Sequence, residues 1–175
     1  MTNDRRNAIE KLANSVREQL HISTPVNVKE IISTLGGSVR SERFDDSSIS
    51  GKIQRKGSSF EISYNGAHSD ERSTFTIAHE LGHLFLHMGY LLDEEKWNNA
   101  EEYCDSPMYR QGYSEEEYEA NQFAGSLLMP SDEYRTFVKE HSKERKIDVN
   151  SIAVHFGVSF DAALTRGKWI GIFEW

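Results

Sequence analysis

The sequence predicts an α+β fold that is mostly helical, with a small antiparallel sheet packed on one central helix. Three observations support this prediction. Apolar residues recur at helical intervals through most of the chain, and strict alternation of apolar and polar residues is confined to residues 49–65. The third observation is a strongly apolar run at residues 74–87, which has the spacing of a buried helix. At 175 residues the chain is long enough for a single domain with its own core.

The first half of the chain predicts two helices followed by a hairpin. Residues 7–20 form an amphipathic helix whose apolar positions are Ile9, Leu12, Val16 and Leu20. A second helix lies within residues 24–37 and stops at the paired glycines 36 and 37. The alternating residues 49–65 flank the turn sequence RKGSS and predict a β-hairpin, which ends at the turn residues Asn65 and Gly66.

The second half of the chain predicts further helices around one loop. A helix starts near Ser69 or Asp70 and contains the apolar run, and the polar residues 93–115 are expected to form a loop. The next helix lies within residues 114–130, with Ser114 as its N-cap, Glu117 completing a capping box and Pro130 following its end. Beyond it we expect a helix at 131–141, two short helices joined at Gly157 within 148–169, and a final strand at 170–175.

The composition excludes several classes of protein. The net charge of −8 argues against direct nucleic-acid binding through a basic surface. No apolar stretch approaches the length of a membrane span, and the polar N-terminus lacks the apolar centre of a signal peptide. The single cysteine, Cys104, cannot form an internal disulfide and is typical of the reducing cytoplasm. We therefore expect a cytoplasmic protein; nothing in the sequence indicates its oligomeric state.

The run TFTIAHELGHLFLH contains the pattern HExxH. His79 and His83 are four residues apart, so on a helix they point the same way, one turn apart and about 40° apart around the axis. Two imidazoles at this spacing can reach one Zn²⁺ ion. Glu80 lies beside His79 and can act as general base towards a water on the metal. The pattern therefore predicts a zinc site with Glu80 as its catalytic residue.

The rest of this helix is apolar, which favours the metal interpretation over a surface helix with chance histidines. The apolar arc consists of Ile77, Ala78, Leu81, Leu84, Phe85 and Met88. Gly82 costs about 1 kcal/mol relative to Ala in a helix, so we expect it to admit a neighbouring backbone. His87 continues the row of histidines and is interpreted as a hydrogen-bonded neighbour of the ligands, not as a fourth ligand.

A catalytic zinc needs a third protein ligand. The extended motif HExxHxxGxxH fails, because Leu86 and Gly89 occupy the positions of its glycine and third histidine. The remaining source is the acidic start of the helix at 114–130. Glu117 is favoured over Glu119 because it shares a face with Asn121, which can orient a ligand histidine, and with the small residues that follow.

Two blocks together, FTIAHELGHLFLH and EYEANQFAGSLLMP, resemble the ImmA/IrrE family of small bacterial metallopeptidases. The two leading helices, the hairpin and the segment VHFGVSFDAALTRG are also similar, so the resemblance covers most of the chain, whereas the tail RGKWIGIFEW departs from the family pattern. The resemblance implies one metallopeptidase domain over residues 1–175, with a catalytic core at 1–130 and a C-terminal helical segment at 131–175. It also implies Glu117 as the third ligand, three residues before Ala120.

The family resemblance implies a cytoplasmic zinc endopeptidase of the gluzincin type. Its expected protein substrate is a helix-turn-helix repressor or paired regulator, whose cleavage relieves repression in a phage, mobile-element, toxin–antitoxin or stress-response module. A second group is needed to stabilise the oxyanion, and the sequence leaves five candidates: His87, Tyr90, Tyr103, Tyr109 and Tyr113. The hairpin is a possible edge for pairing with an extended substrate.

Two other interpretations stay open on the sequence. One is a catalytically silent zinc-site protein that binds a regulator without cleaving it. The other is a DNA-binding regulator, because residues 148–166 have the rhythm of a helix-turn-helix and are completed by Arg166 and Lys168. The acidic net charge and the few base-reading side chains argue against the second interpretation.

Overall fold

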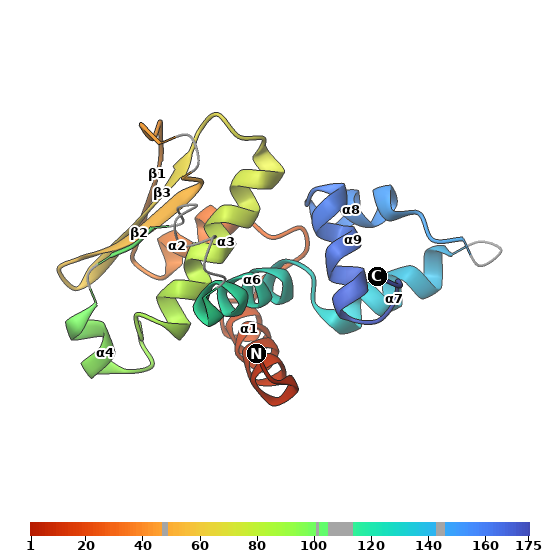
Figure 1. The fold of residues 1–175 in the computed structure, drawn as a ribbon, viewed down its shortest axis with the longest axis horizontal. Helices are drawn as coiled ribbons and strands as arrows, with labels where there is room; N and C mark the ends of the chain where they lie inside the picture. Colours follow the sequence, from red (N-terminus) through yellow and green to blue (C-terminus); the bar gives the residue numbers. More distant parts are fainter. Residues whose placement is uncertain (47–48, 101, 105–113, 143–145) are drawn as a thin grey trace.

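The computed structural model describes residues 1–46, 49–100, 102–104, 114–142 and 146–175, and it confirms the α+β class (Figure 1). The helices are α1 (Asn3–Gln19), α2 (Val28–Thr34), α3 (Asp70–Leu86), α4 (Glu94–Asn99), α6 (Glu115–Leu128), α7 (Ser131–His141), α8 (Val149–Phe156) and α9 (Phe160–Trp169). The strands are β1 (Ser38–Glu42), β2 (Gly51–Lys56), β3 (Ser59–Asn65) and β4 (Glu102–Cys104). Within the described residues no helix has both the length and the apolar character that crossing a membrane requires.

The helices begin where polar side chains satisfy free backbone N–H groups. Ser69 caps α3 by accepting from the N–H of Arg72, and Ser114 caps α6 by accepting from the N–H of Glu117. Both starts agree with the sequence prediction. Only half of the predicted capping box forms at α6. The side chain of Glu117 does not return to the N-cap, because its two carboxylate oxygens lie 3.2 Å from histidines of α3.

The sheet is mixed, with the strand order β1-β3-β2-β4. The predicted hairpin of residues 49–65 is confirmed as the antiparallel pair β2 and β3. The small sheet was predicted to be antiparallel; it differs from this prediction at one pairing, because β1 pairs with β3 in parallel. The chain reverses once between β1 and β2 and again in the hairpin, so β3 returns in the direction of β1.

Two stretches differ from the sequence prediction. Residues 93–115 were expected to form a loop, yet they contain α4 and β4. Trp97 of α4 packs edge-on against Tyr90, and β4 extends the sheet by pairing with β2, so tertiary contacts create both short elements. The expected final strand at 170–175 is also absent: the tail folds back, and the N–H of Ile172 donates to the carbonyl of Gly167.

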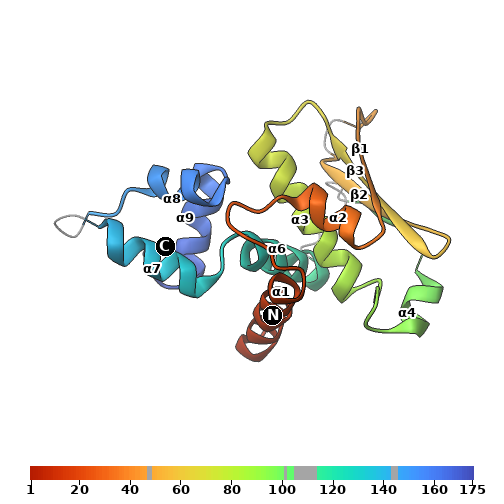
Figure 2. The same ribbon diagram turned by 180° about the vertical axis from the view of Figure 1, so that it is seen from behind.

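Helix α3 lies at the centre of the molecule, between the sheet and α6 (Figures 1 and 2). Its apolar arc is buried as predicted, with Ala78, Leu81 and Leu84 fully inaccessible. Gly82 admits the close approach of α6, because a Cβ atom there would lie 2.9 Å from the Cα of Ala120. This contact confirms the packing role expected for Gly82, and it fixes how closely the two helices meet.

Helices α7, α8 and α9 lie beyond α6, on the side away from the sheet (Figures 1 and 2). The predicted pair of short helices around Gly157 is confirmed, and Gly157 adopts the left-handed conformation that ends α8. Arg166 of α9 is 4% exposed and connects these helices to the rest of the chain. Its side chain donates to the carbonyl of Met129 and to Glu10 of α1.

Candidate metal centre

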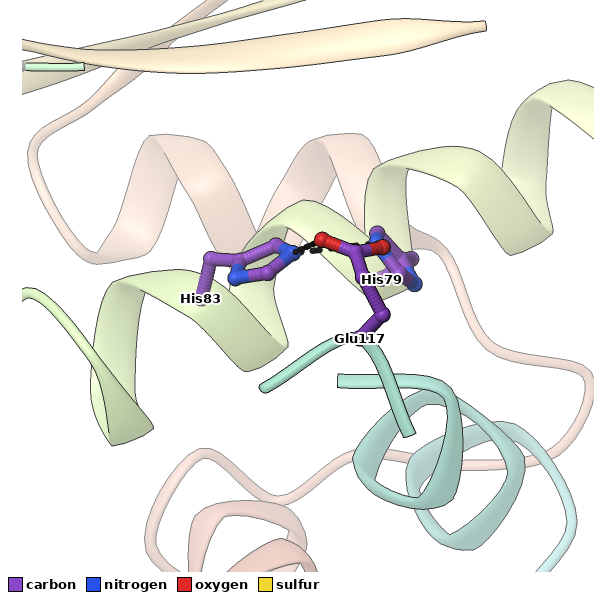
Figure 3. A group of neighbouring side chains, drawn as sticks. All are labelled: His79, His83 and Glu117. Atoms are coloured by element: carbon purple, nitrogen blue, oxygen red, sulfur yellow. Dashed lines mark hydrogen bonds and ion pairs between the residues drawn. The ribbon is translucent and has the colours of Figure 1, made fainter. Parts of the chain in front are cut away.

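Three side chains from two helices meet at one point in the interior. His79 and His83 extend from successive turns of α3, and Glu117 reaches them from the first turn of α6 (Figure 3). The Nε2 atoms of the two histidines are 3.1 Å apart. The Glu117 oxygens lie 3.2 Å from each of them, Oε2 from His79 and Oε1 from His83. The structure thus brings together the three ligands that the sequence predicts.

The electrostatics of the triad favour a carboxylate that stays ionised. Burial by itself raises the pKa of Glu117, but hydrogen bonds and charge interactions with His79 and His83 outweigh burial and hold that pKa well below its usual range. His79 is 5% exposed and His83 is 1% exposed, so the imidazoles are nearly withdrawn from water. A negative charge held between two buried imidazoles is an arrangement suited to a bound cation.

Asn121 fixes the orientation of His79. The Asn121 Oδ1 atom lies 3.0 Å from the Nδ1 atom of His79. An amide oxygen only accepts, so Nδ1 carries the proton and the lone pair of Nε2 faces the centre of the triad. Asn121 is on the α6 face shared with Glu117, and the structure places it as the orienting neighbour that the sequence predicts.

The donor set fits a zinc ion. Zinc takes imidazole nitrogen and carboxylate oxygen at roughly 2.0–2.2 Å, so two ligands of a tetrahedral ion are separated by about 3.3 Å. The separations of 3.1 to 3.2 Å among the three donors agree with this value. Three protein ligands also leave one position for water or substrate, which is the pattern of a catalytic site.

Glu80 follows His79 and is completely buried. Its position depends on Gly51 of β2, because a Cβ atom at residue 51 would lie 2.9 Å from Oε1 of Glu80 and 2.5 Å from Cγ2 of Thr76. In the sequence, Gly51 is part of an alternating strand, and that alternation does not reveal this role. A glycine inside a strand is the available signal, since it often marks the close approach of another group.

The other predicted site residues have different partners. Glu119 does not join the triad: its carboxylate pairs with Arg5 and lies 3.2 Å from Nε2 of His87. His87 uses its other nitrogen, Nδ1, to contact Nδ1 of His83 at 2.9 Å. Neither ring nitrogen of His87 is thus placed as an oxyanion donor, whereas its predicted position beside a ligand agrees with the structure.

Among the tyrosines predicted as candidate oxyanion donors, Tyr90 has a described side chain, and that side chain does not reach the triad. Tyr90 is 9% exposed, stacks edge-on against Phe60 and donates its hydroxyl to the carbonyl of Leu35. It is therefore a core residue. The side chain of Tyr103 and the whole of Tyr109 and Tyr113 lie outside the described part of the chain.

The fold and the site together define a small α+β protein with an HExxH metal centre completed by a glutamate from a second helix. The Peptidase_M78 family, described as the IrrE N-terminal-like domain, matches residues 32–168. The chain belongs to this metallopeptidase family, as the resemblance noted from the sequence predicts. No curated protein matches the chain significantly.

A solved structure, a Mycobacterium tuberculosis transcriptional regulator, has a similar fold. The two chains are 18% identical, with a TM-score of 0.57. The similarity covers 96% of the present chain and 48% of the regulator, so this chain spans about half the length of that protein. At this identity the comparison concerns the fold alone.

Proposed function

We propose that this protein is a zinc-dependent endopeptidase. The observation that carries the proposal is the convergence of His79, His83 and Glu117, whose donor atoms are separated by 3.1 to 3.2 Å. A purely structural metal site has no need of a buried general base, yet Glu80 follows the first histidine at full burial. Membership in a metallopeptidase family supports the same conclusion.

The chemistry divides between the metal and the protein. His79, His83 and Glu117 would hold the zinc ion, which when bound supplies Lewis-acid activation of water and of the peptide carbonyl. Glu80 would accept the proton from the attacking water and deliver it to the nitrogen of the leaving amine. Its burial excludes bulk water, which strengthens its interactions with the charges that develop during the reaction.

For the substrate, we propose a helix-turn-helix repressor or a paired regulator in the cytoplasm, whose cleavage relieves repression in a phage, mobile-element, toxin–antitoxin or stress-response module. The support is the likeness to the ImmA/IrrE family and membership in Peptidase_M78. The fold neighbour is itself named a transcriptional regulator, and this name is compatible with a place in gene regulation.

Of the two alternatives, direct DNA binding receives no support from the geometry. Arg166, one of the two cations assigned to it, is 4% exposed and hydrogen-bonded to Met129 and Glu10. Lys168 is then the only Lys or Arg of α8 and α9 left for phosphate contacts. A catalytically silent protein that binds a regulator has the same metal ligands, so only an assay of cleavage separates it from the peptidase.

The test compares wild type with Glu80→Gln, which removes the base and keeps the shape. Both proteins are analysed for bound metal and incubated with helix-turn-helix regulators encoded near the gene, and cleavage is followed by mass spectrometry. We expect both to bind one zinc ion, and the variant to cleave at least about 100-fold more slowly. Glu116→Gln, at an exposed position one residue before Glu117, is the matched control and should retain full activity.

Two results would contradict the proposal. Equal cleavage by wild type and Glu80→Gln would exclude Glu80 as general base. Stable binding of a regulator by the zinc-loaded wild type, with no cleavage, would support the catalytically silent alternative.

A further inference from the structure

We infer that Arg5 and Glu119 are positioning residues for the metal ligand His83, acting through His87, so that helix α1 is a working part of the metal centre. This inference rests on the proposed zinc site. It assigns a role to two residues that the triad and the general base leave unexplained.

A continuous line of contacts runs from the surface to the buried ligand. Arg5 of α1 donates from Nε and Nη2 to the two oxygens of Glu119, each at 2.6 Å. The Glu119 Oε2 atom lies 3.2 Å from Nε2 of His87. The His87 Nδ1 atom lies 2.9 Å from Nδ1 of His83. Three helices, α1, α6 and α3, with the residue that ends α3, therefore contribute to this line.

The direction of each hydrogen bond follows from metal binding. When Nε2 of His83 is a metal ligand, Nδ1 carries the proton and donates to His87. The Nδ1 atom of His87 then accepts, so the proton of the neutral ring is on Nε2, facing Glu119. The carboxylate of Glu119 accepts the hydrogen bond from Nε2 of His87 and both hydrogen bonds from Arg5. Its oxygens therefore act only as acceptors, as those of an ionised carboxylate must.

The alternative is that the Arg5–Glu119 ion pair only holds α1 against α6. Two features favour the positioning role. The same oxygen, Oε2, accepts from both Arg5 and His87, so the ion pair is shared with the ring beside the ligand. The side chains of His87 and Glu119 are 5% and 10% exposed, whereas the Arg5 side chain is 43% exposed. The contacts therefore connect a partly exposed cation to a buried imidazole.

The two ligand histidines thus have separate supports. His79 is oriented by Asn121 of α6, and His83 is oriented by a chain that ends on α1. The family match begins at residue 32 and does not include α1, so Arg5 contributes from outside the matched region. Hydrogen-bonded partners of zinc ligands typically contribute 10- to 100-fold to metal affinity.

The test measures zinc affinity of the whole chain by competition with a chromophoric chelator, without any peptidase assay. We expect Glu119→Gln and Arg5→Met to raise the Kd for zinc about 10-fold. Arg5→Lys should give an intermediate Kd, because an ammonium group keeps the charge but cannot donate two parallel hydrogen bonds from one plane. Melting temperatures of the metal-free proteins are recorded alongside.

Arg17→Met is the matched control. Arg17 is also on α1 and donates to the carbonyl of Leu127 on α6, so its loss weakens the same helix pair without touching the line to His83. Its Kd for zinc should equal that of wild type. A second measurement is the tautomer of His87 in the zinc-loaded protein, read from long-range ¹⁵N NMR: we expect the proton on Nε2.

The possible outcomes separate the inference from the proposed function. If wild type binds no zinc, both are overturned. If wild type binds zinc and the Arg5 and Glu119 variants bind it equally well, the positioning role is excluded while the peptidase proposal stands. An equal loss in Arg17→Met would assign the effect to general packing of α1, and a proton on Nδ1 of His87 would contradict the proposed direction.

Discussion

Glu117 and Glu119 are two residues apart on α6 and have different partners. Two residues on a helix are about 200° apart around the axis, so only one of them can face α3 at the level of His79 and His83. Glu117 contacts both imidazoles, and Glu119 turns towards Arg5 and His87. Both carboxylates sit beside a histidine pair or an arginine, and each has its pKa lowered by such partners, so both remain ionised at neutral pH.

His87 gives the metal-free protein a predictable pH dependence. Burial, followed by the charge of His83, lowers the pKa of His87 to about 4 from the ordinary value of 6.5. Between these values the unfolded chain binds a proton that the folded chain does not, so the free energy of unfolding falls as the pH drops. From pH 7 to pH 5 this group contributes a loss of roughly 2 kcal/mol.

Urea unfolding of the metal-free protein at pH 7 and pH 5 tests this expectation. His87→Gln should lose roughly 2 kcal/mol less than wild type over this interval, because glutamine does not titrate. His141→Gln, at an exposed residue of α7, is the control and should behave as wild type. If His87→Gln loses as much free energy of unfolding as wild type between pH 7 and pH 5, the prediction is wrong.

Among the elements, the distance between α3 and α6 is decisive, because the two helices supply all three metal ligands. Gly82 sets this distance. In Gly82→Ala the new methyl group meets the backbone of Ala120, with Cα at 2.9 Å and the carbonyl oxygen at 3.0 Å. Helix propensity gains about 1 kcal/mol, but overpacking against backbone costs about 1–3 kcal/mol.

We therefore expect Gly82→Ala to lower the melting temperature and to weaken zinc binding, because α6 must shift and move Glu117 away from the histidines. Gly125→Ala on α6 is the matched control: its methyl group would meet only Cδ of Arg166 at 3.7 Å, an ordinary contact. That variant should be as stable as wild type or more stable, by up to about 1 kcal/mol. Calorimetry and chelator competition measure both effects, and equal zinc affinity in the two variants would exclude the proposed role of Gly82.

For the whole molecule, the attachment of α7, α8 and α9 depends on a buried charge. Arg166 donates to Glu10 at 3.1 Å, to Ser131 at 3.0 Å and to the carbonyl of Met129 at 3.0 Å. Burial lowers the pKa of Arg166, and Glu10 opposes this shift most strongly. The ion pair of Glu10 and Arg166 joins α1 to α9, so it connects residues near the two ends of the sequence.

Arg166→Met should lower the free energy of unfolding by about 1–3 kcal/mol, because the carbonyl of Met129 loses its donor and Glu10 loses its counter-charge. Lys168→Met, two residues further along α9, removes a surface cation and is expected to change stability by less than about 1 kcal/mol. Urea unfolding followed by circular dichroism measures both. A loss below about 1 kcal/mol in Arg166→Met would show that apolar packing alone holds the C-terminal helices.

The sequence by itself determined the local features of this protein: the helix starts at Ser69 and Ser114, the hairpin, and the common direction of His79 and His83. Each depends on residues a few positions apart, where backbone geometry alone decides the outcome. Only the tertiary structure decided the parallel pairing of β1, the closeness of Gly51 to Glu80 and the line from Arg5 to His83. These contacts join distant segments, as with Arg5 and Glu119, 114 residues apart, and depend on how helices and strands pack, which no local pattern encodes.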